Sequence, residues 1–185
     1  MYVTREILAQ AEAVLGSPTE LHMAYEITPD ELAMIRRSQR HGRAHDVTTC
    51  MLAGDRVAVI AKHNYPQGMY RIPGGGLEPG ESLLDGAVRE ALEETGLPYT
   101  IARYLLRVDV AFTCGVERID WMTHIVTGTA PFTVPAPLDL REIREARWMS
   151  LEDLQGPVAE RMLATGRPLF AYRVALHQAT VARLL

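Results

Sequence analysis

The sequence lacks the features that mark secreted and membrane-spanning proteins. Its 185 residues include two cysteines, Cys50 and Cys114, which lie in apolar strand-like runs without the spacing of a metal site. We expect both to be buried free thiols in a reducing cytoplasm. No apolar run approaches the roughly 18 residues that a membrane span needs, and the first residues carry charge where a signal sequence would be apolar. These absences favour a cytoplasmic protein without a membrane partner.

An excess of positive charge is also lacking. The 19 Lys and Arg residues against 23 Asp and Glu residues give a net charge of −4, so electrostatics does not favour a nucleic-acid partner. The six histidines are scattered and show no metal-ligand spacing. A content of 48% hydrophobic and 23% charged residues is that of one globular domain. An acidic protein still binds polyphosphates where a metal ion reverses the local field.

Residues 73–97, PGGGLEPGESLLDGAVREALEETGL, combine a glycine turn with a capped helix. Ser82 is the predicted N-cap, and Gly96, followed by a proline, is the predicted stop. At about 100° per residue, five apolar residues share one face of this helix. They are Leu83, Leu84, Ala87, Val88 and Ala91.

Three carboxylates, Glu90, Glu93 and Glu94, fall together on the other face, because residues three and four apart are neighbours on a helix. They repel one another unless something positive lies among them, so we expect Glu93→Gln or Glu94→Gln to leave the fold stable. Carboxylates are also the ligands that hard divalent cations prefer. Gly86 projects from the same face and would leave room for a metal or a phosphate. A solvated acidic face is the alternative for the carboxylates taken alone.

The spacing of residues 75–97 resembles the Nudix box, G-x5-E-x7-R-E-U-x-E-E-x-G-U, where U is aliphatic. Every defined position matches, and Ala91 is the softest match because a bulkier aliphatic residue is usual there. The resemblance implies an α/β fold, namely a Nudix-type α/β/α sandwich with a mixed, curved sheet. It also implies an enzyme that hydrolyses a diphosphate linkage in a nucleoside diphosphate derivative or a (d)NTP, a nucleotide-like small molecule.

The resemblance also implies roles for individual residues. Glu90 would orient the attacking water or accept its proton, while Arg89 and Glu81 would complete the catalytic set as supports of the site. The cofactor would be Mg²⁺ or Mn²⁺. Its implied ligands are the carbonyl of Gly74 and the carboxylates of Glu90, Glu93 and Glu94.

Many members of this family use a further acidic residue outside the box. The sequence offers four candidates without choosing among them: Glu117, Asp120, Glu142 and Glu145. Arg71 is predicted to hold a substrate phosphate, and an ordinary place on a strand surface is its alternative. Tyr70 and Trp121 are either platforms for a nucleobase or buried aromatic residues.

Residues 1–45 are predicted to form an N-terminal helical extension ahead of a Nudix domain at residues 46–185. One amphipathic helix is expected at residues 4–15, and a second begins at Thr28 with a capping box. The second helix runs into a basic cluster, which faces either an anionic substrate or solvent. The cluster comprises Arg36, Arg37, Arg40, His41 and Arg43. Dimerisation into a homodimer, substrate selection and plain packing are all open roles for the extension.

Within the predicted domain, apolar β-rich runs at residues 47–52 and 57–61 predict a hairpin. Runs at residues 99–113 and 118–129 predict a second hairpin, and residues 142–148 a last strand. Residues 151–185 are predicted to be helical, with interruptions at Gly156 and Gly166.

The substrate is not fixed by the sequence. The proline, tyrosine and other secondary marks of several Nudix subfamilies are missing around the box. A sugar-nucleotide, ADP-ribose-type or other organic pyrophosphatase is therefore an alternative enzyme. A Nudix-derived ligand-binding regulatory module is an alternative of another class, although three retained carboxylates argue against it.

Overall fold

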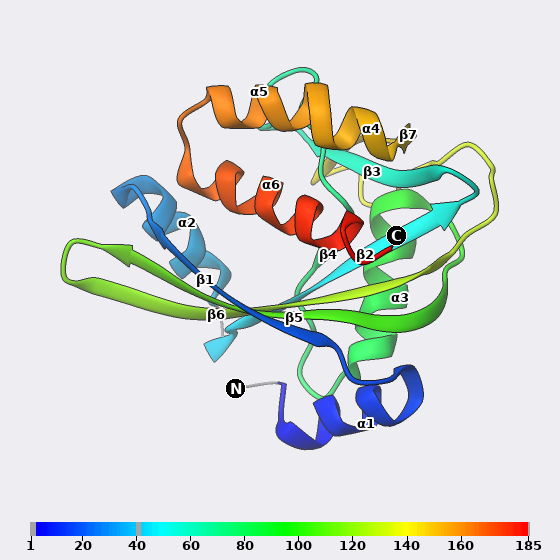
Figure 1. Ribbon diagram of the computed structural model, residues 1–185, viewed down its shortest axis with the longest axis horizontal. Helices are drawn as coiled ribbons and strands as arrows, with labels where there is room; N and C mark the ends of the chain where they lie inside the picture. Colours follow the sequence, from blue (N-terminus) through cyan, green and yellow to red (C-terminus); the bar gives the residue numbers. More distant parts are fainter. Residues whose placement is uncertain (1–2, 40–41, 185) are drawn as a thin grey trace.

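The computed structural model describes residues 3–39 and 42–184 and shows a mixed α/β fold, in which a curved sheet lies between two layers of helices (Figure 1). This confirms the predicted fold class. The strands are β1 (Thr19–Glu26), β2 (His45–Ala53), β3 (Arg56–Lys62), β4 (Gly74–Gly75), β5 (Thr100–Cys114), β6 (Glu117–Thr129) and β7 (Ile143–Ser150). The helices are α1 (Arg5–Leu15), α2 (Pro29–Ser38), α3 (Leu83–Thr95), α4 (Leu151–Asp153), a π-helical turn (Leu154–Val158), α5 (Ala159–Ala164) and α6 (Pro168–Val181).

The strand order is β1-β5-β6-β2-β3-β7, with β4 paired to β2. The β1–β5 and β2–β6 pairs are parallel and the other pairs are antiparallel. Two residue pairs beside the hairpin turn join β2 to β3. Farther from the turn, β2 pairs with β4, whereas Ile60 of β3 pairs with Arg71. The two strands therefore diverge, and the glycine turn enters the sheet between them.

The N-terminal segment contains a strand that the sequence did not predict. The two expected helices are present, since Thr4 caps α1 and Thr28 caps α2 with the predicted capping box. Between them, β1 pairs in parallel with β5 over eight residue pairs. The apolar residues Leu21 and Met23 alternate with polar ones along β1, and this alternation was the available signal. The first 45 residues thus extend the sheet as well as adding helices.

Helices cover both faces of the sheet (Figure 1). On one face, α1 and α3 pack on a core that includes Leu83, Ala87 and Tyr104. On the other face, α2 and α6 share a core with strands β5 and β6, in which Ile35 and Tyr172 are buried. Because helices from both ends of the chain lie on this second face, residues far apart in sequence meet there.

Glu31 fastens α2 to α6. It is fully buried, and its carboxylate accepts from the backbone N–H of Thr28 at 3.2 Å, which completes the capping box. The same carboxylate accepts from the backbone N–H of Leu169 at 3.1 Å, in the first turn of α6, and lies 3.4 Å from Nε of Arg167. One acidic side chain therefore satisfies free N–H groups at the starts of two helices.

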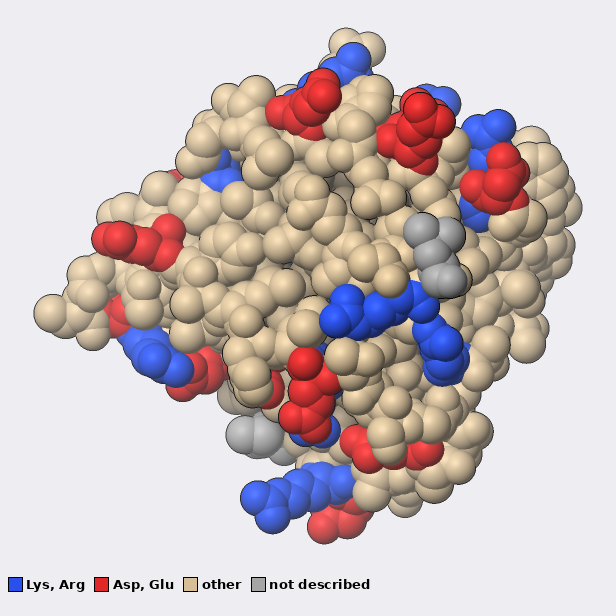
Figure 2. Space-filling model, viewed as in Figure 1, with Lys and Arg blue, Asp and Glu red and all other residues tan. Residues whose placement is uncertain are grey.

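The face of the molecule drawn in Figure 2 carries charges of both signs. Lys and Arg side chains alternate with Asp and Glu over the face in Figure 2, and no large field of one sign covers the described atoms drawn there. Among residues 3–39 and 42–184, no helix has both the length and the apolar character needed to cross a membrane.

Candidate active site

Helix α3 forms as its sequence predicts. Oγ of Ser82 accepts from the backbone N–H of Asp85 at 3.1 Å, and Gly96 ends the helix with φ of 69°, a left-handed conformation suited to glycine. The buried face contains Leu83, Ala87 and Ala91 as expected, but Val88 is exposed. The buried arc is instead completed by Glu94 and Thr95 at the end of the helix, where one carboxylate turns inward.

Arg89 is the centre of a hydrogen-bond network. Its guanidinium forms a fork with Glu81, with Nε to Oε1 and Nη2 to Oε2 both at 2.8 Å. Nη2 also donates to the carbonyl of Gly76 at 2.8 Å, and Nη1 donates to Glu90 at 2.9 Å and to Glu93 at 3.2 Å. One cation thus joins the glycine turn to two of the three carboxylates, and it supplies the positive charge that their proximity requires.

The third carboxylate is held separately and deeper. Glu94 accepts from Nη2 of Arg71 at 2.8 Å and from the backbone N–H of Gly74 at 2.6 Å. The side chains of Arg71 and Glu94 are only 4% and 6% exposed. Arg71 also donates to the carbonyls of Ile72 and Gly74. The residue expected to contact substrate is therefore engaged inside the protein, where it fixes the direction of Glu94.

The glycine turn brings the backbone close to both neighbours. Gly74 has φ of +149°, and a Cβ there would overlap the carbonyl oxygen of Val47 on β2. A Cβ on Gly75 would overlap the carboxylate of Glu90. Because both positions lack side chains, β4 pairs with β2 while α3 lies against the turn.

Gly86 was expected to leave room for a metal or a phosphate beside the carboxylates. A Cβ at this position would lie 3.0 Å from Oε2 of Glu81 and 3.2 Å from Leu77. The space that Gly86 leaves is therefore filled by Glu81, which reaches Arg89 through it, and the expectation of room for a metal or a phosphate is wrong.

Burial and charge shape the ionisation of the site. Burial, followed by the charge of Glu94, raises the pKa of Glu90 to about 7, although Arg89 works in the opposite direction. Burial disfavours the charged form of Glu81, but the hydrogen bonds from Arg89 and from the backbone N–H of Glu78, together with the charge of Arg89, outweigh burial and lower the pKa of Glu81. Burial lowers the pKa of Arg71, but the negative charges around it, that of Glu94 foremost, together outweigh burial and raise the pKa. Burial is thus the main reason that the charged form of Glu90 is disfavoured.

The chemistry of the donor set fits a hard divalent cation. Glu90, Glu93 and Glu94 offer carboxylate oxygens to one cavity, and a cation there would relieve the repulsion that Glu94 and Glu93 exert on Glu90. Across the described residues, however, no three acidic, histidine or cysteine side chains already stand in an arrangement that could hold a metal ion. The guanidiniums of Arg89 and Arg71 hold these carboxylates in their present positions.

The structure distinguishes the four acidic candidates outside the box. Glu117 and Asp120 form ion pairs with arginines near the far end of the β5–β6 hairpin, and Glu145 accepts from the hydroxyl of Tyr70 at 3.0 Å. Only Glu142 among the four lines the cavity, and Nζ of Lys62 lies 2.6 Å from its carboxylate. The hydrogen bond and the charge of Lys62 lower the pKa of Glu142.

Asp139 also lines the cavity, and no motif in the sequence predicted this position for it. The backbone N–H groups of Leu138 and Asp139 donate to the carbonyl of Glu93 at 2.9 and 3.0 Å. These bonds fold the loop before β7 back onto the end of α3. This long-range contact, and not a local motif, places Asp139 beside the box carboxylates.

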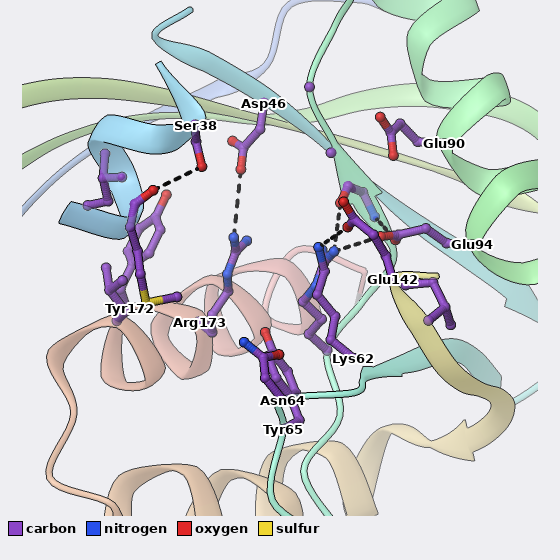
Figure 3. A pocket seen from close by; sticks show the side chains of 18 of the residues that line it. Ser38, Asp46, Lys62, Asn64, Tyr65, Glu90, Glu94, Glu142, Tyr172 and Arg173 are labelled. Carbon is purple, nitrogen blue, oxygen red and sulfur yellow. Dashed lines mark hydrogen bonds and ion pairs between the residues drawn. The ribbon is translucent and has the colours of Figure 1, made fainter. Parts of the chain in front are cut away.

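The cavity has a volume of about 820 Å³ and extends well beyond the carboxylates. Figure 3 shows Glu90 and Glu94 at one side, Ser38 and Tyr172 at the other, and Asp46 and Arg173 between them. The far side is built by α2 and α6, the helices that Glu31 joins. The volume is that of a typical site for a small organic ligand, and the N-terminal segment forms part of its wall.

Comparison with known proteins gives the family. A model of the NUDIX domain matches residues 42–172, which is well over half of the chain. The chain belongs to the Nudix family. The match includes the box and the segment from β2 to α6, so the fold and hydrolase class implied by residues 75–97 are confirmed.

Several named proteins resemble the chain over this region. "Nucleoside diphosphate-linked moiety X motif 6" from Mus musculus is 43% identical over 113 residues, which is 61% of this chain and 34% of the mouse protein. "NAD-capped RNA hydrolase NudC" from Vibrio cholerae is 33% identical over 56% of this chain and 36% of its own length. The matched region thus spans about a third of the length of these two relatives.

Solved structures resemble the chain more distantly. The solution structure of the E. coli ORF135 protein has a TM-score of 0.48 at 19% identity, covering 75% of this chain and 88% of that one. A NUDIX hydrolase from Nitrosomonas europaea has a TM-score of 0.47 at 23% identity, over 60% and 75% of the two chains.

Proposed function

We propose that this Nudix protein is a metal-dependent hydrolase that cleaves a diphosphate linkage in a nucleoside diphosphate derivative or a (d)NTP. The observation that carries the proposal is the Arg89 network, which presents Glu90 and Glu93 to a cavity large enough for a nucleotide. Nudix hydrolases act on nucleotide-like substrates with divalent cations. Mg²⁺ or Mn²⁺ is the cofactor that the oxygen donors favour.

The proposed ligands of the metal are Glu90, Glu93, Glu94 and the carbonyl of Gly74. When bound, the metal would neutralise phosphate oxygens and activate a water molecule. Glu90 orients that water or accepts its proton. Arg89, which is itself bonded to Glu81, holds Glu90 in place by a hydrogen bond.

Arg71 is better suited to positioning than to direct contact with substrate. Its guanidinium is committed to Glu94 and to two carbonyls, so it fixes one proposed ligand from inside the protein. This differs from the phosphate contact that its strand position suggested.

Glu142 is our choice for the acidic residue outside the box. It faces the cavity from the start of β7, and Lys62 keeps it ionised by lowering its pKa. An ionised carboxylate at this place either adds a metal ligand or receives a proton from water. Glu142→Gln should therefore reduce kcat by about 10²-fold or more, a size typical of lost acid–base catalysis. Glu145→Gln is the matched control, because Glu145 is a carboxylate on β7 that does not line the cavity.

The relatives' names favour a nucleotide linked through phosphate groups. One name refers to a nucleoside diphosphate-linked moiety, another to an NAD cap, and a third, from Streptomyces rubellomurinus, to a CMP-linked phosphonate. A sugar nucleotide or ADP-ribose-type compound is thus the second candidate substrate class. A ligand-binding regulatory module is the candidate of another class.

A hydrolysis screen tests the proposal. The purified chain is incubated with Mg²⁺ or Mn²⁺ and with NTPs, oxidised dNTPs, ADP-ribose, sugar nucleotides and dinucleoside polyphosphates. Released phosphate, with and without a coupled phosphatase, shows which bond is cut. We expect turnover that depends on metal and is lost in Glu93→Gln. If folded, metal-loaded protein hydrolyses no compound of the panel, the ligand-binding regulatory module would be favoured.

Metal binding is measured separately from activity. Titration with Mn²⁺, followed by electron paramagnetic resonance, should show weaker binding in Glu93→Gln than in the wild type. Glu160→Gln is the matched control, because Glu160 is an exposed carboxylate on α5 that does not line the cavity. Equal Mn²⁺ affinity in all three proteins would remove Glu93 from the proposed ligands.

A further inference from the structure

The cavity wall contains several cations, and most of them already face a carboxylate. Ion pairs within 4 Å join five of these side chains to acidic residues: Lys62, Arg71, Arg89, Arg167 and Arg173. Arg43 also lines the cavity, but no carboxylate among the described residues pairs with it. Its charge is therefore available to an anion that enters the cavity.

Arg43 is held in place through groups other than carboxylates. Its Nε donates to the carbonyl of His45 at 2.9 Å, and its guanidinium carbon lies 5.4 Å from the centre of the Trp121 ring. Trp121 is only 8% exposed and so provides a fixed platform for a cation–π contact. In the described structure, no residue accepts a hydrogen bond from the two terminal nitrogens of Arg43.

The guanidinium also lies directly against the glycine turn. A Cβ on Gly76 would overlap the guanidinium of Arg43, so glycine at this position allows the contact. The carbonyl of the same Gly76 accepts from Arg89, the residue that holds Glu90 and Glu93. Arg43 therefore contacts the same glycine whose carbonyl accepts from Arg89 and, through Arg89, is linked to Glu90 and Glu93.

We propose that Arg43 binds a phosphate group of the substrate at the glycine turn and is a specificity-determining residue outside the Nudix box. The inference rests on the proposed function, since it names the phosphate contact of the same site. A guanidinium anchored through Nε still offers two N–H-bearing nitrogens, and this fork matches two oxygens of one phosphate. No other cation of the cavity wall is left without an acidic partner among the described residues.

This placement separates Arg43 from the rest of the basic cluster. Arg36 pairs with Glu117 near the tip of the β5–β6 hairpin, away from the cavity, and Arg37 is exposed. Arg40 and His41 lie outside the described residues. The sequence left open whether the basic cluster faces solvent or an anionic substrate. Arg36 lies on the surface, whereas Arg43 faces the cavity, so each alternative applies to a different residue of the cluster.

Calorimetric binding of inorganic pyrophosphate, measured with Mg²⁺ and again with EDTA, tests the proposal without turnover. Arg43→Gln should weaken the affinity by about 10- to 100-fold, the size of a lost charge-assisted hydrogen bond. Arg43→Lys keeps the charge without the fork, so its loss should be smaller. Arg36→Gln is the matched control from the same cluster, and we expect its affinity to stay within about twofold of the wild type.

Kinetics on the best substrate of the hydrolysis screen supply a second readout. Loss of a phosphate contact made in both ground and transition states should raise KM by more than it lowers kcat. A merely structural Arg43 would instead lower Tm in Arg43→Gln while pyrophosphate affinity stayed unchanged, and this result would overturn the proposal. Failure of the wild type to bind pyrophosphate would also overturn it.

A second variant tests the geometry. Gly76→Ala introduces a methyl group where the guanidinium lies, and the backbone of Gly76 is outside the positive-φ region that only glycine favours. We expect this variant to weaken pyrophosphate binding, and the double variant with Arg43→Gln to bind no more weakly than Arg43→Gln alone. Fully additive losses would contradict the contact. If these affinity differences are found but the wild type hydrolyses no substrate, the result would count against the proposed function and not against the phosphate contact.

Discussion

The buried pair of Arg71 and Glu94 gives the sharpest prediction on stability. Arg71→Met keeps most of the side-chain volume but leaves Glu94 buried, with the N–H of Gly74 as its remaining hydrogen-bond donor in the described structure. Removing one partner of a buried ion pair costs about 3–5 kcal/mol, because the other charge remains out of water. We expect a loss of this size in the free energy of unfolding.

The double variant Arg71→Met/Glu94→Gln removes both charges, and replacement of a whole buried pair by neutral groups is often nearly neutral. Its loss should therefore be smaller than that of Arg71→Met by about 2 kcal/mol or more, the upper part of the range for directly contacting residues. Urea denaturation of the four proteins in EDTA, followed by circular dichroism, gives the coupling energy. Arg36→Met, which breaks an exposed pair with Glu117, should cost less than about 1 kcal/mol.

Two results would refute this reasoning. If the losses of Arg71→Met and Glu94→Gln simply add, the two side chains are not coupled as the contact requires. If Arg71→Met costs no more than Arg36→Met, the buried charge is compensated elsewhere. Either result would return Arg71 to the phosphate contact that its place in the sequence suggested.

Two further predictions concern other parts of the fold. Burial, together with the charges of His45 and Arg107, lowers the pKa of His124 to about 3 from 6.5, so the unfolded chain takes up the proton first. The contribution of His124 to stability should therefore be fully present above about pH 6.5 and fall by about 1.4 kcal/mol per pH unit below it. His177, whose pKa burial also lowers to about 3, adds a slope of the same sign. His124→Gln should therefore reduce the total slope by about 1.4 kcal/mol per pH unit in urea titrations across this range, and an unchanged slope would contradict the assignment. Gly74→Ala should cost more stability than the control Gly80→Ala, because both have positive φ but only Gly74 meets backbone across the sheet; equal thermal shifts would refute this.

The sequence predicted those parts of the site that depend on local signals. The cap at Ser82, the stop at Gly96 and the clustering of Glu90 and Glu93 on one helix face follow from helix geometry, and all are present. These features lie within one turn and one helix, so their spacing in sequence determines their spacing in the fold.

Features that depend on packing between distant segments could not be predicted in the same way. Strand β1 has only a short alternation of apolar and polar residues as a local signal, and its pairing with β5 joins segments that are far apart in the sequence. Asp139 reaches the site because the loop before β7 folds back on α3. The proposed phosphate contact of Arg43 depends on Trp121 of β6, a residue distant in sequence that lies beneath its guanidinium.

The carboxylates show most clearly how tertiary contacts change a local argument. From the helix alone, removal of any one charge should relieve repulsion and leave the fold stable. The structure supports this for Glu93, which is half-exposed and shares Arg89 with its neighbours. For Glu94 it argues the reverse, because Glu94→Gln would leave the buried guanidinium of Arg71 without its anion. Two adjacent glutamates on one helix face therefore differ in kind: Glu93 is free to serve a ligand with little effect on stability, whereas Glu94 ties the site to the core.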